Sequence, residues 1–452
     1  MRKLAPILLL LLFLPALLWL IRQTVKIVGR ASGTPANIVV DASENVGFLP
    51  RPWKAMAQGG EELTSFLDNL EKEVKGLGLR YIRIDHLYDA FDVVSRDGTG
   101  LKFNWSRLDT LVDKIQKTGA IPFFALSYTP AVIAKTDIVS MPRDWNEWSL
   151  VVQKTIEHYS GEKKIANVYY EVWNEPDLFG KLTSSSYIPL YRAAAIGAAR
   201  ARTSQKFQFG GPATTGLYKS WVDLLLKTAE QERLRLDFVS WHRYDKDPER
   251  FIKDIEEVEG FIAQRPYFSD VEVLITEWGP DSNNSPMYDN LAGAAHLLSV
   301  IRRQLGRINL AFMFSVKDGN DPKGTTFWGR WGLFSSDHTG NKPKPRYTAL
   351  VWLNSLGEER LSLSGEGSWV TGIAAKKGET IQIILTNYDV SGRHSEVVPL
   401  RINGLSGNTY TYKEKYLSGG SRNIEVASTQ AVVSQQILLK PNDSVLIEMT
   451  PK

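Results

Sequence analysis

The chain has 452 residues, of which 43% are hydrophobic and 23% are charged, an ordinary composition for a globular protein. It contains no cysteine, which excludes thiol nucleophiles, cysteine–zinc sites and iron–sulfur clusters. The 54 lysines and arginines nearly balance the 50 acidic residues, and a net charge of +4 is too small to indicate a nucleic-acid partner.

The N-terminus combines a basic start with an apolar run. Met1-Arg2-Lys3 precedes leucine-rich residues 4–21, which carry no polar face. A basic start before an apolar run is typical of a secretory signal, and this run is close to the minimum for a membrane span. No small-x-small cleavage site follows. We therefore expect 1–31 to be a signal peptide or, in preference, an uncleaved membrane anchor, which places the protein on the membrane facing the periplasm or cell exterior, or outside the cell.

From Asn45 to Leu356 short apolar segments of strand character alternate with longer amphipathic segments of helix character. The predicted strands are Val46–Leu49, Tyr81–Asp85, Ile121–Ser127, Val168–Trp173, Phe207–Gly210, Phe238–Trp241, Val271–Thr276 and Leu310–Val316. The predicted helices are Glu61–Gly76, Arg107–Thr118, Trp145–Tyr159, Tyr187–Ala201, Tyr218–Glu232, Pro248–Gln264, Ala292–Gly306 and Tyr347–Leu356. Repeated strand–helix alternation indicates a parallel sheet, and eight pairs favour an α/β fold with a (β/α)8 TIM barrel over 32–356.

After Leu356 the long helical patterns stop and short alternating segments follow, separated by Gly, Asn and Ser. The predicted strands are Gly372–Ala375, Thr380–Thr386, Glu396–Ile402, Thr409–Tyr416, Gln435–Leu439 and Ser444–Thr450. This pattern predicts a small C-terminal β-sandwich over 357–452.

Catalytic residues of TIM barrels lie at the carboxyl ends of the strands, and several predicted strands end in polar residues. Strand two ends in Arg83-Ile84-Asp85-His86, strand four in Glu171-Val172-Trp173-Asn174-Glu175-Pro176, strand six in Ser240-Trp241-His242-Arg243-Tyr244, and strand seven in Thr276-Glu277-Trp278-Gly279. Carboxylates at the ends of buried strands are costly unless the charge has a purpose. Strands four and seven lie across the barrel mouth from each other, so Glu175 and Glu277 could flank one bond.

Glycosidic cleavage needs two such carboxylates, one donating a proton to the leaving oxygen and the other attacking the anomeric carbon or activating water. The sequence does not give their separation, which decides between retention and inversion. Asn174-Glu175-Pro176 alone could be a helix N-terminus with proline near its first position. The second motif on strand seven makes the catalytic interpretation the stronger one.

Asn174-Glu175-Pro176 after strand four, with Thr276-Glu277-Trp278-Gly279 on strand seven, resembles clan A of the glycoside hydrolases. Within the clan the chain is similar to family 39, which holds β-xylosidases, α-L-iduronidases and bacterial exopolysaccharide hydrolases. The resemblance implies a retaining enzyme with Glu175 as acid/base and Glu277 as nucleophile. It also implies substrate contacts through Asn174, which would bind the sugar 2-hydroxyl, and through four further residues: Arg83, His86, His242 and Tyr244.

One departure concerns the platform beneath the sugar. Clan members usually carry a tryptophan at the end of strand eight, where this chain reads Phe312-Met313-Phe314-Ser315-Val316-Lys317-Asp318. We expect Trp328 and Trp331 in the following loop to replace it, with Lys317 and Asp318 lining the mouth. Trp278 is a further candidate for stacking on sugar, unless it belongs to the core.

Two other carboxylates receive structural interpretations. Asp85 is taken as a partner for Arg83. Glu171 is taken as structural, because strand alternation puts Glu171 and Trp173 on the face opposite to Asn174. His86 could also be an exposed loop histidine, and His242 and Tyr244 could be ordinary packing residues.

The predicted function is thus retaining hydrolysis of a β-linked oligo- or polysaccharide, such as an exopolysaccharide. The six histidines show no metal-ligand spacing and no glycine-rich phosphate loop follows a strand, so we expect neither a metal nor a cofactor. Two alternatives stay open. A glycan-binding protein would not need both glutamates, and a transglycosylase would keep both and exclude water from the intermediate.

Overall fold

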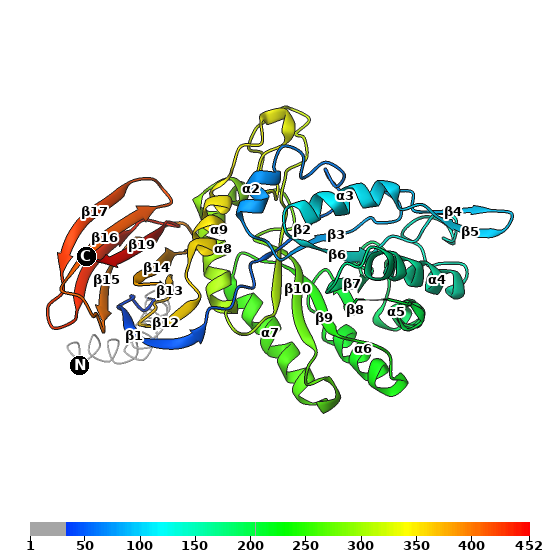
Figure 1. The fold of residues 1–452 in the computed structure, drawn as a ribbon, viewed down its shortest axis with the longest axis horizontal. Coiled ribbons are helices and arrows are strands. Elements are labelled where there is room, and N and C mark those ends of the chain that lie inside the picture. The colour runs from blue at the N-terminus through cyan, green and yellow to red at the C-terminus, as the bar shows by residue number, and fades with distance from the viewer. Residues whose placement is uncertain (1–32, 204) are drawn as a thin grey trace, which may run out of the picture.

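The structure is a computed structural model that describes residues 33–203 and 205–452. A barrel with its helices lies beside a smaller β-domain (Figure 1). The predicted signal or anchor segment 1–31 lies outside the described residues. Within the described ranges, no helix is both long enough and apolar enough to cross a membrane.

The larger body is a closed barrel of eight strands, and each neighbouring pair is parallel. Its strands are β2 (Ala55–Gln58), β3 (Tyr81–Ile84), β6 (Ile121–Leu126), β7 (Val168–Val172), β8 (Phe207–Thr214), β9 (Phe238–Tyr244), β10 (Glu272–Gly279) and β11 (Leu310–Phe314). The order around the barrel follows the chain, and β11 closes on β2. The predicted (β/α)8 fold is confirmed, and seven predicted strands coincide with β3 and β6–β11.

Helices follow the barrel strands and cover the outside of the barrel (Figure 1). They are α2 (Glu71–Gly76), α3 (Ser106–Lys117), α4 (Trp145–Ile156) with a π-helical turn (Glu157–Glu162), α5 (Ser184–Arg200), α6 (Lys219–Glu232), α7 (Pro248–Ala263), α8 (Leu291–Gln304) and α9 (Pro345–Ser355). Short 3-10 turns span Pro266–Phe268, Pro286–Asp289 and Asp337–Thr339, and the hairpin β4 (Val94–Asp97) and β5 (Gly100–Phe103) projects after β3.

Side-chain caps fix where several helices begin. Asp144, Asp247 and Asn290 each accept a hydrogen bond from a backbone N–H two residues later, at the starts of α4, α7 and α8. Thr183 and Ser186 form a reciprocal capping box at the start of α5. Each cap satisfies a donor that the helix itself leaves unpaired.

The first predicted barrel strand, Val46–Leu49, is wrong. Most of that segment belongs to β1 (Ile38–Phe48), which pairs with strands of the β-domain, and the first barrel strand is β2. The sequence Ala-Met-Ala-Gln of β2 has no β-branched residue, so propensity gave no signal, although all four residues are buried. The helix that follows is also shorter than predicted, because Glu62 and Asn69 adopt positive φ angles of 56° and 61°.

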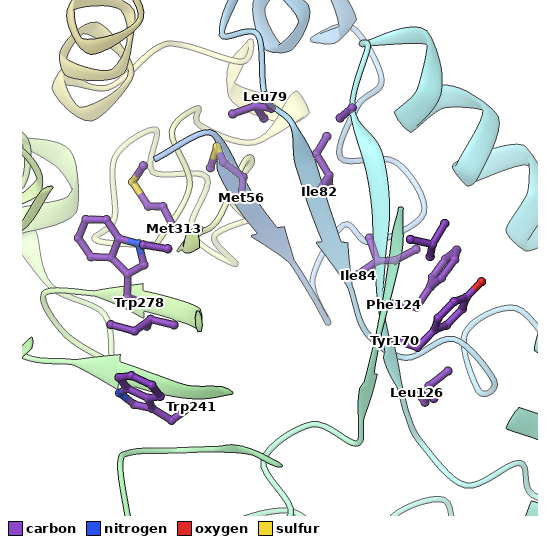
Figure 2. Packing of buried hydrophobic residues seen from close by; sticks show 14 of the residues in the cluster. Met56, Leu79, Ile82, Ile84, Phe124, Leu126, Tyr170, Trp241, Trp278 and Met313 are labelled. Carbon is purple, nitrogen blue, oxygen red and sulfur yellow. The ribbon is translucent and has the colours of Figure 1, made fainter. Parts of the chain in front are cut away.

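Side chains alternate between the two faces of the barrel wall. Inward-facing aromatic residues fill the interior, with the rings of Tyr81 and Tyr169 5.0 Å apart and those of Phe123 and Phe312 4.7 Å apart. Outward-facing residues such as Ile82, Phe124 and Trp241 belong to a second cluster, shared with the helices (Figure 2). The interior is therefore a packed core, and reactive groups can gather only at the barrel's ends.

The β-domain is a nine-stranded, mostly antiparallel sheet in the order β17-β16-β19-β14-β13-β12-β1-β15-β18. Its C-terminal strands are β12 (Glu359–Ser364), β13 (Val370–Lys377), β14 (Thr380–Asn387), β15 (Glu396–Asn403), β16 (Thr409–Tyr416), β17 (Ser421–Ala427), β18 (Val433–Leu439) and β19 (Ser444–Pro451). Val426 of β17 and Ile437 of β18 share one hydrophobic cluster although their strands are the two edges of the sheet. The sheet therefore folds over its own core as the predicted β-sandwich, with β1 as an additional N-terminal strand.

The sandwich packs on the side of the barrel that carries α8. Arg302 of α8 forms a bidentate ion pair with Glu366 at 2.7–2.9 Å, and the Tyr388 hydroxyl donates to the carbonyl of Lys246 at 2.7 Å. The Tyr388 ring also contacts His296 of α8.

Candidate active site

Two glutamates meet at the carboxyl ends of β7 and β10. Glu175 follows β7 and Glu277 lies on β10, across the barrel from it. Glu277 is 6% exposed, and Glu175 is partly exposed. Oxygen atoms of the two carboxylates and a ring nitrogen of His242 lie within 4.8 Å of one another. The two strand-end motifs therefore form one cluster.

A β-bulge in β10 sets the direction of Glu277. Ile275 pairs with Trp241 of β9, but Glu277 pairs with the next residue, His242, so Thr276 is the extra residue. Leu274 packs inside the barrel, and strict alternation would place residues 276 and 278 on that same inner face. The bulge shifts the alternation by one residue, which turns Glu277 inward and Trp278 outward.

Arg83 of β3 holds Glu277 by a hydrogen-bonded ion pair. Its Nη1 donates to Glu277 Oε1 at 2.8 Å, its Nε to Glu171 Oε2 at 2.7 Å and its Nη2 to Asn174 Oδ1 at 2.8 Å. The arginine is 1% exposed, so these charge-assisted bonds form out of contact with water. The hydroxyl of Tyr244 donates a further bond to Glu277 Oε2 at 3.0 Å.

The shared contact of Glu171 and Asn174 with Arg83 differs from the sequence expectation. Alternation predicted opposite faces for these two residues, but β7 ends at Val172 and Trp173 has a φ of 78°. This left-handed residue reverses the direction of the following side chain. Glu171 supports the site from beneath through Arg83, which agrees with its predicted structural role.

Glu175 is positioned by its own backbone and by His242. It has a φ of 45°, and its N–H donates to the carbonyl of Ala213 at 2.9 Å. Nδ1 of His242 lies 2.9 Å from Glu175 Oε1 and 3.7 Å from Glu277 Oε2. The imidazole can therefore interact with either carboxylate when that carboxylate is charged.

Burial and charge shift the protonation of this cluster in opposing directions. Burial raises the pKa of Glu277 above the ordinary glutamate value, while the positive charges of His242 and Arg83 oppose the rise. Burial alone would lower the pKa of His242, but the carboxylates of Glu277 and Glu175 outweigh burial, and the pKa of the ring is raised. Burial, followed by the charge of Glu277, raises the pKa of Tyr244, which keeps its phenol a hydrogen-bond donor.

A pocket of about 640 Å³ opens above the two glutamates. The residues lining it come from several strand-end loops: Gly59, Gly60, Glu61, Asp85, His86, Tyr128, Asn174, Glu175, Leu178, Phe179, Thr215, Tyr244, Glu277, Ser282, Asn283, Phe314, Arg330 and Trp331. Six of the predicted site residues line it: Asn174, Glu175, His86, Tyr244, Glu277 and Trp331. Arg83 and His242 lie beneath the lining and contact the two glutamates directly.

Three predictions around the pocket need correction. Trp278 is buried in the outer cluster beside Phe251 and His296, paired in register with Met313, as the bulge requires (Figure 2). Trp328 lies outside the lining, under the guanidinium of Arg330, which stacks on both Trp328 and Trp331.

Lys317 and Asp318 do not line the mouth either. Lys317 is buried against Asp337 at 2.7 Å, and Asp318 is buried against Lys344 at 2.7 Å. Both pairs fasten the loop that follows β11. The sequence alone could not distinguish such buried pairs from charges at a pocket mouth.

Two of the lining residues that the sequence did not assign to the site are Tyr128 and Asp85. Tyr128 follows β6 and belongs to no motif that the sequence analysis singled out. Its hydroxyl accepts a hydrogen bond from Asn174 Nδ2 at 3.1 Å. Asp85 lines the pocket and makes no hydrogen bond to Arg83 among the described residues, although the charges of the two groups interact as expected of partners. Both residues follow the carboxyl end of a barrel strand, and that position is the signal by which the sequence could have placed them in the pocket.

The cluster could in principle hold a metal ion, because Glu175, His242 and Glu277 each offer a ligand atom. Nδ1 of His242 is already bonded to Glu175, and both oxygens of Glu277 accept bonds from Arg83 and Tyr244. These hydrogen bonds instead place the two carboxylates in different surroundings. One is held by an arginine and a phenol, and the other faces the pocket beside an imidazole.

Comparison with known proteins agrees with this geometry. The model of the family described as Glycosyl hydrolases family 39 matches residues 37–423. A β-xylosidase from Caldicellulosiruptor saccharolyticus is 26% identical over 395 residues, covering 78% of this chain and 79% of that protein. The α-L-iduronidase of Homo sapiens is 25% identical over 281 residues, covering 54% of this chain and 42% of that protein.

Solved structures share the fold. A GH39 enzyme from Xanthomonas axonopodis pv. citri superposes with a TM-score of 0.78 at 20% identity, covering 93% of this chain and 98% of that one. A monomeric β-xylosidase from Caulobacter crescentus gives 0.75 at 21% identity, covering 92% and 99%. Both coverages span the barrel together with the sandwich.

Proposed function

Because the chain belongs to family 39 of the glycosyl hydrolases and is an O-glycosyl hydrolase, we propose that it cleaves a β-linked glycan with retention, by double displacement. Glu277 is the nucleophile and Glu175 the acid/base. One observation carries the proposal: oxygens of the two carboxylates lie within 4.8 Å of each other. That spacing suits the roughly 5 Å of retaining enzymes, whereas inverting enzymes need about 6.5–9.5 Å to admit a water.

Glu277 has the surroundings of a nucleophile. The hydrogen bonds from Arg83 and Tyr244 stabilise its ionised form and fix its orientation toward the pocket. Attack on the anomeric carbon converts this carboxylate to a neutral ester, and the leaving oxygen takes a proton from Glu175. Water then gives a proton to Glu175 and its oxygen attacks the anomeric carbon, which releases Glu277.

His242 links the two steps. At the start, the negative charge it faces is on Glu277, at 3.7 Å; in the covalent intermediate the charge is on Glu175, at 2.9 Å. A buried imidazole with a raised pKa can stabilise both states without moving. Its role is therefore to balance the two carboxylates as their charges exchange.

The β-linkage is supported by the β-xylosidases, which match this chain over a longer segment than the α-L-iduronidases do. The substrate class is an oligo- or polysaccharide, consistent with a pocket lined by loops from most of the barrel. From the sequence of 1–31 we further propose that the enzyme is membrane-anchored or exported and acts on a polysaccharide outside the cytoplasm. Recovery of the protein from the soluble cytoplasmic fraction would contradict this localisation.

The test is hydrolysis of a panel of aryl glycosides and polysaccharides by the wild type, Glu277→Gln and Glu175→Gln. Retention predicts that the anomer first formed, observed by proton NMR, matches the substrate. Glu277→Gln should lose activity by on the order of 10⁴-fold or more, the scale seen when a covalent nucleophile is removed. An inverted first product, or full activity in Glu277→Gln, would refute the mechanism. Transfer to added sugar in place of water would indicate a transglycosylase, and binding without cleavage a glycan-binding protein.

A further inference from the structure

Asp85 is a buried carboxyl group in the pocket for which the proposed mechanism has no use. It follows β3, lines the pocket and is 4% exposed. Its Oδ1 has no hydrogen-bond partner among the residues that the structure describes. A buried carboxyl oxygen without a hydrogen-bond donor is costly, so a donor supplied by a ligand would explain its presence. Burial raises the pKa of Asp85, while the positive charges of His86 and Arg83 oppose the rise.

The chain around Asp85 is built to fit this carboxyl. A Cβ atom added at Gly59 would lie 2.5 Å from Asp85 Oδ2 and 2.6 Å from Oδ1, so only glycine allows the loop after β2 to approach so closely. The backbone of Gly60 also bonds to the carboxyl. Rotation about the Cβ–Cγ bond of an aspartate is soft, so either oxygen can be presented to the pocket.

The position of Asp85 places it beside the sugar that Glu277 attacks. Arg83 lies on β3 and Asp85 comes directly after its last residue, two positions further on, so extended backbone directs both side chains to the same inner side. Arg83 bonds Glu277 directly. The negative charge of Asp85 also acts on Glu277, raising its pKa. A sugar ring held over Glu277 therefore has Asp85 along its edge.

The nearby cations are already engaged. The basic side chains in the described lining of the pocket are His86, which is paired with Asp89 at 2.7 Å, and Arg330, which is paired with Glu61. Beneath them, Arg83 is occupied by two glutamates and Asn174. A sugar carboxylate entering this pocket would meet the Asp85 carboxyl, and every basic side chain in the described lining already has an acidic partner.

We propose that Asp85 accepts hydrogen bonds from hydroxyl groups of the sugar bound over Glu277 and thereby selects an uncharged sugar over a uronic acid. This inference rests on the proposed function and specifies its substrate class. A carboxylate can accept from two adjacent ring hydroxyls at once, and this bidentate contact orients the sugar as well as binding it. A uronate at the same place meets like-charge repulsion in a desolvated pocket.

The experiment is a double-mutant cycle in which one change removes the Asp85 carboxyl and the other removes a hydroxyl of the substrate. The substrates are the 4-nitrophenyl glycoside that the wild type cleaves fastest and its monodeoxy analogues, each assayed with the wild type, Asp85→Ala and Asp85→Asn. In the wild type, deleting the contacted hydroxyl should lower kcat/KM by about 10- to 100-fold, the range of a hydrogen bond to a charged group. In Asp85→Ala the same deletion should cost less than about 3-fold, because the partner is already gone.

Glu61→Gln is the matched control. Glu61 is another acid in the pocket lining, but its carboxylate is paired with Arg330. It should retain the wild-type penalty for every deoxy analogue. Unfolding midpoints of all variants separate local loss of binding from loss of folded protein. If Asp85→Ala lowers kcat/KM by one common factor for every analogue, Asp85 has a structural role and the proposal fails.

The charge arm compares matched glycosides and uronides, such as 4-nitrophenyl β-glucoside with β-glucuronide and the galacto pair. The wild type should prefer the neutral member, and Asp85→Asn should reduce that preference at least about 10-fold, because it removes the like charge. Preference of the wild type for a uronide would overturn the proposal.

Failure of the proposed function would look different. If the wild type cleaves none of the glycosides, calorimetric binding of the same neutral glycosides to wild type and Asp85→Ala decides the role of Asp85. Weaker binding by the variant supports it, and equal binding or none refutes it.

Discussion

Nδ1 of His242 lies 2.9 Å from Oε1 of Glu175 and also 3.7 Å from Oε2 of Glu277. The two carboxylates thus share one buried imidazole, while only Glu277 is bonded by the buried Arg83. This asymmetry separates the group that attacks from the group that exchanges protons. It also allows the direction of the change in pKa or activity to be predicted for single substitutions.

Removing His242 should move the acid limb of the pH–activity profile upward. Attack requires ionised Glu277, whose pKa is raised by burial, so activity should decline at a higher pH than for an ordinary glutamate as the solution is acidified. The charge of His242 lowers the pKa of Glu277, and His242→Gln removes that charge. The limb in kcat/KM should therefore shift to higher pH. A shift to lower pH, or none, would contradict this electrostatic role.

Glu175→Gln should show a loss that depends on the leaving group. Protonation of the leaving oxygen matters most for a poor leaving group and little for a very acidic phenol. We expect a loss of about 10²–10⁴-fold with unactivated glycosides, the usual size of general-acid catalysis, and a much smaller one for glycosylation by a 2,4-dinitrophenyl glycoside. The check is a plot of rate against phenol acidity. Equal losses along the series would rule out Glu175 as the acid.

Arg83→Lys should impair both catalysis and folding. A lysine has one point charge and cannot bond Glu171, Glu277 and Asn174 in a fixed plane as the guanidinium does. Lysine keeps the positive charge, but each buried acceptor that it leaves unsatisfied costs about 1–3 kcal/mol, which denaturant unfolding would measure. The kcat of the folded variant should also fall, because Glu277 loses a directional hydrogen-bond donor. A variant with wild-type stability and kcat would show that the cluster is dispensable.

Tyr244→Phe removes one hydrogen bond to Glu277 and no charge. The expected loss in kcat is about 10- to 100-fold, from a bond to a charged acceptor worth ~1.5–3 kcal/mol. Since the hydroxyl makes no other hydrogen bond among the described residues, stability should change little. Steady-state kinetics and a thermal melt together test this. A lower unfolding midpoint with unchanged kcat would show that Tyr244 serves stability and not catalysis.

Two tryptophans should respond in opposite ways. Trp331→Ala opens a wall of the pocket and should raise KM, while Trp278→Ala creates a cavity in the outer cluster and should cost about 3–5 kcal/mol of stability. Trp278→Phe should be milder, because the indole N–H has no partner among the described residues. KM and the free energy of unfolding are measured for each variant. A raised KM in Trp278→Ala, or a large loss of stability in Trp331→Ala, would show that the two roles are assigned the wrong way round.

The sequence by itself determined the barrel, most of its strands, and the two glutamates. Apolar strands that end in polar residues are visible in one dimension, because burial imposes their pattern before any contact is known. The Asn-Glu-Pro and Thr-Glu-Trp-Gly segments at the ends of strands four and seven supplied the roles of the two glutamates through their resemblance to clan A of the glycoside hydrolases. The strand Ala55–Gln58 escaped because alanine and methionine carry no β signal, and its neighbour β1 joined another sheet.

Only the tertiary structure decided which way the side chains face. The bulge at Thr276 and the left-handed Trp173 each shift the alternation by one residue, which sends Trp278 into the core and brings Asn174 to Arg83. Charges behave similarly: Lys317 and Asp318 are buried in ion pairs, whereas Asp85 interacts with Arg83 through charge but leaves its Oδ1 without a hydrogen bond among the described residues. Such outcomes depend on contacts between residues far apart in the chain, and local pattern contains no record of them.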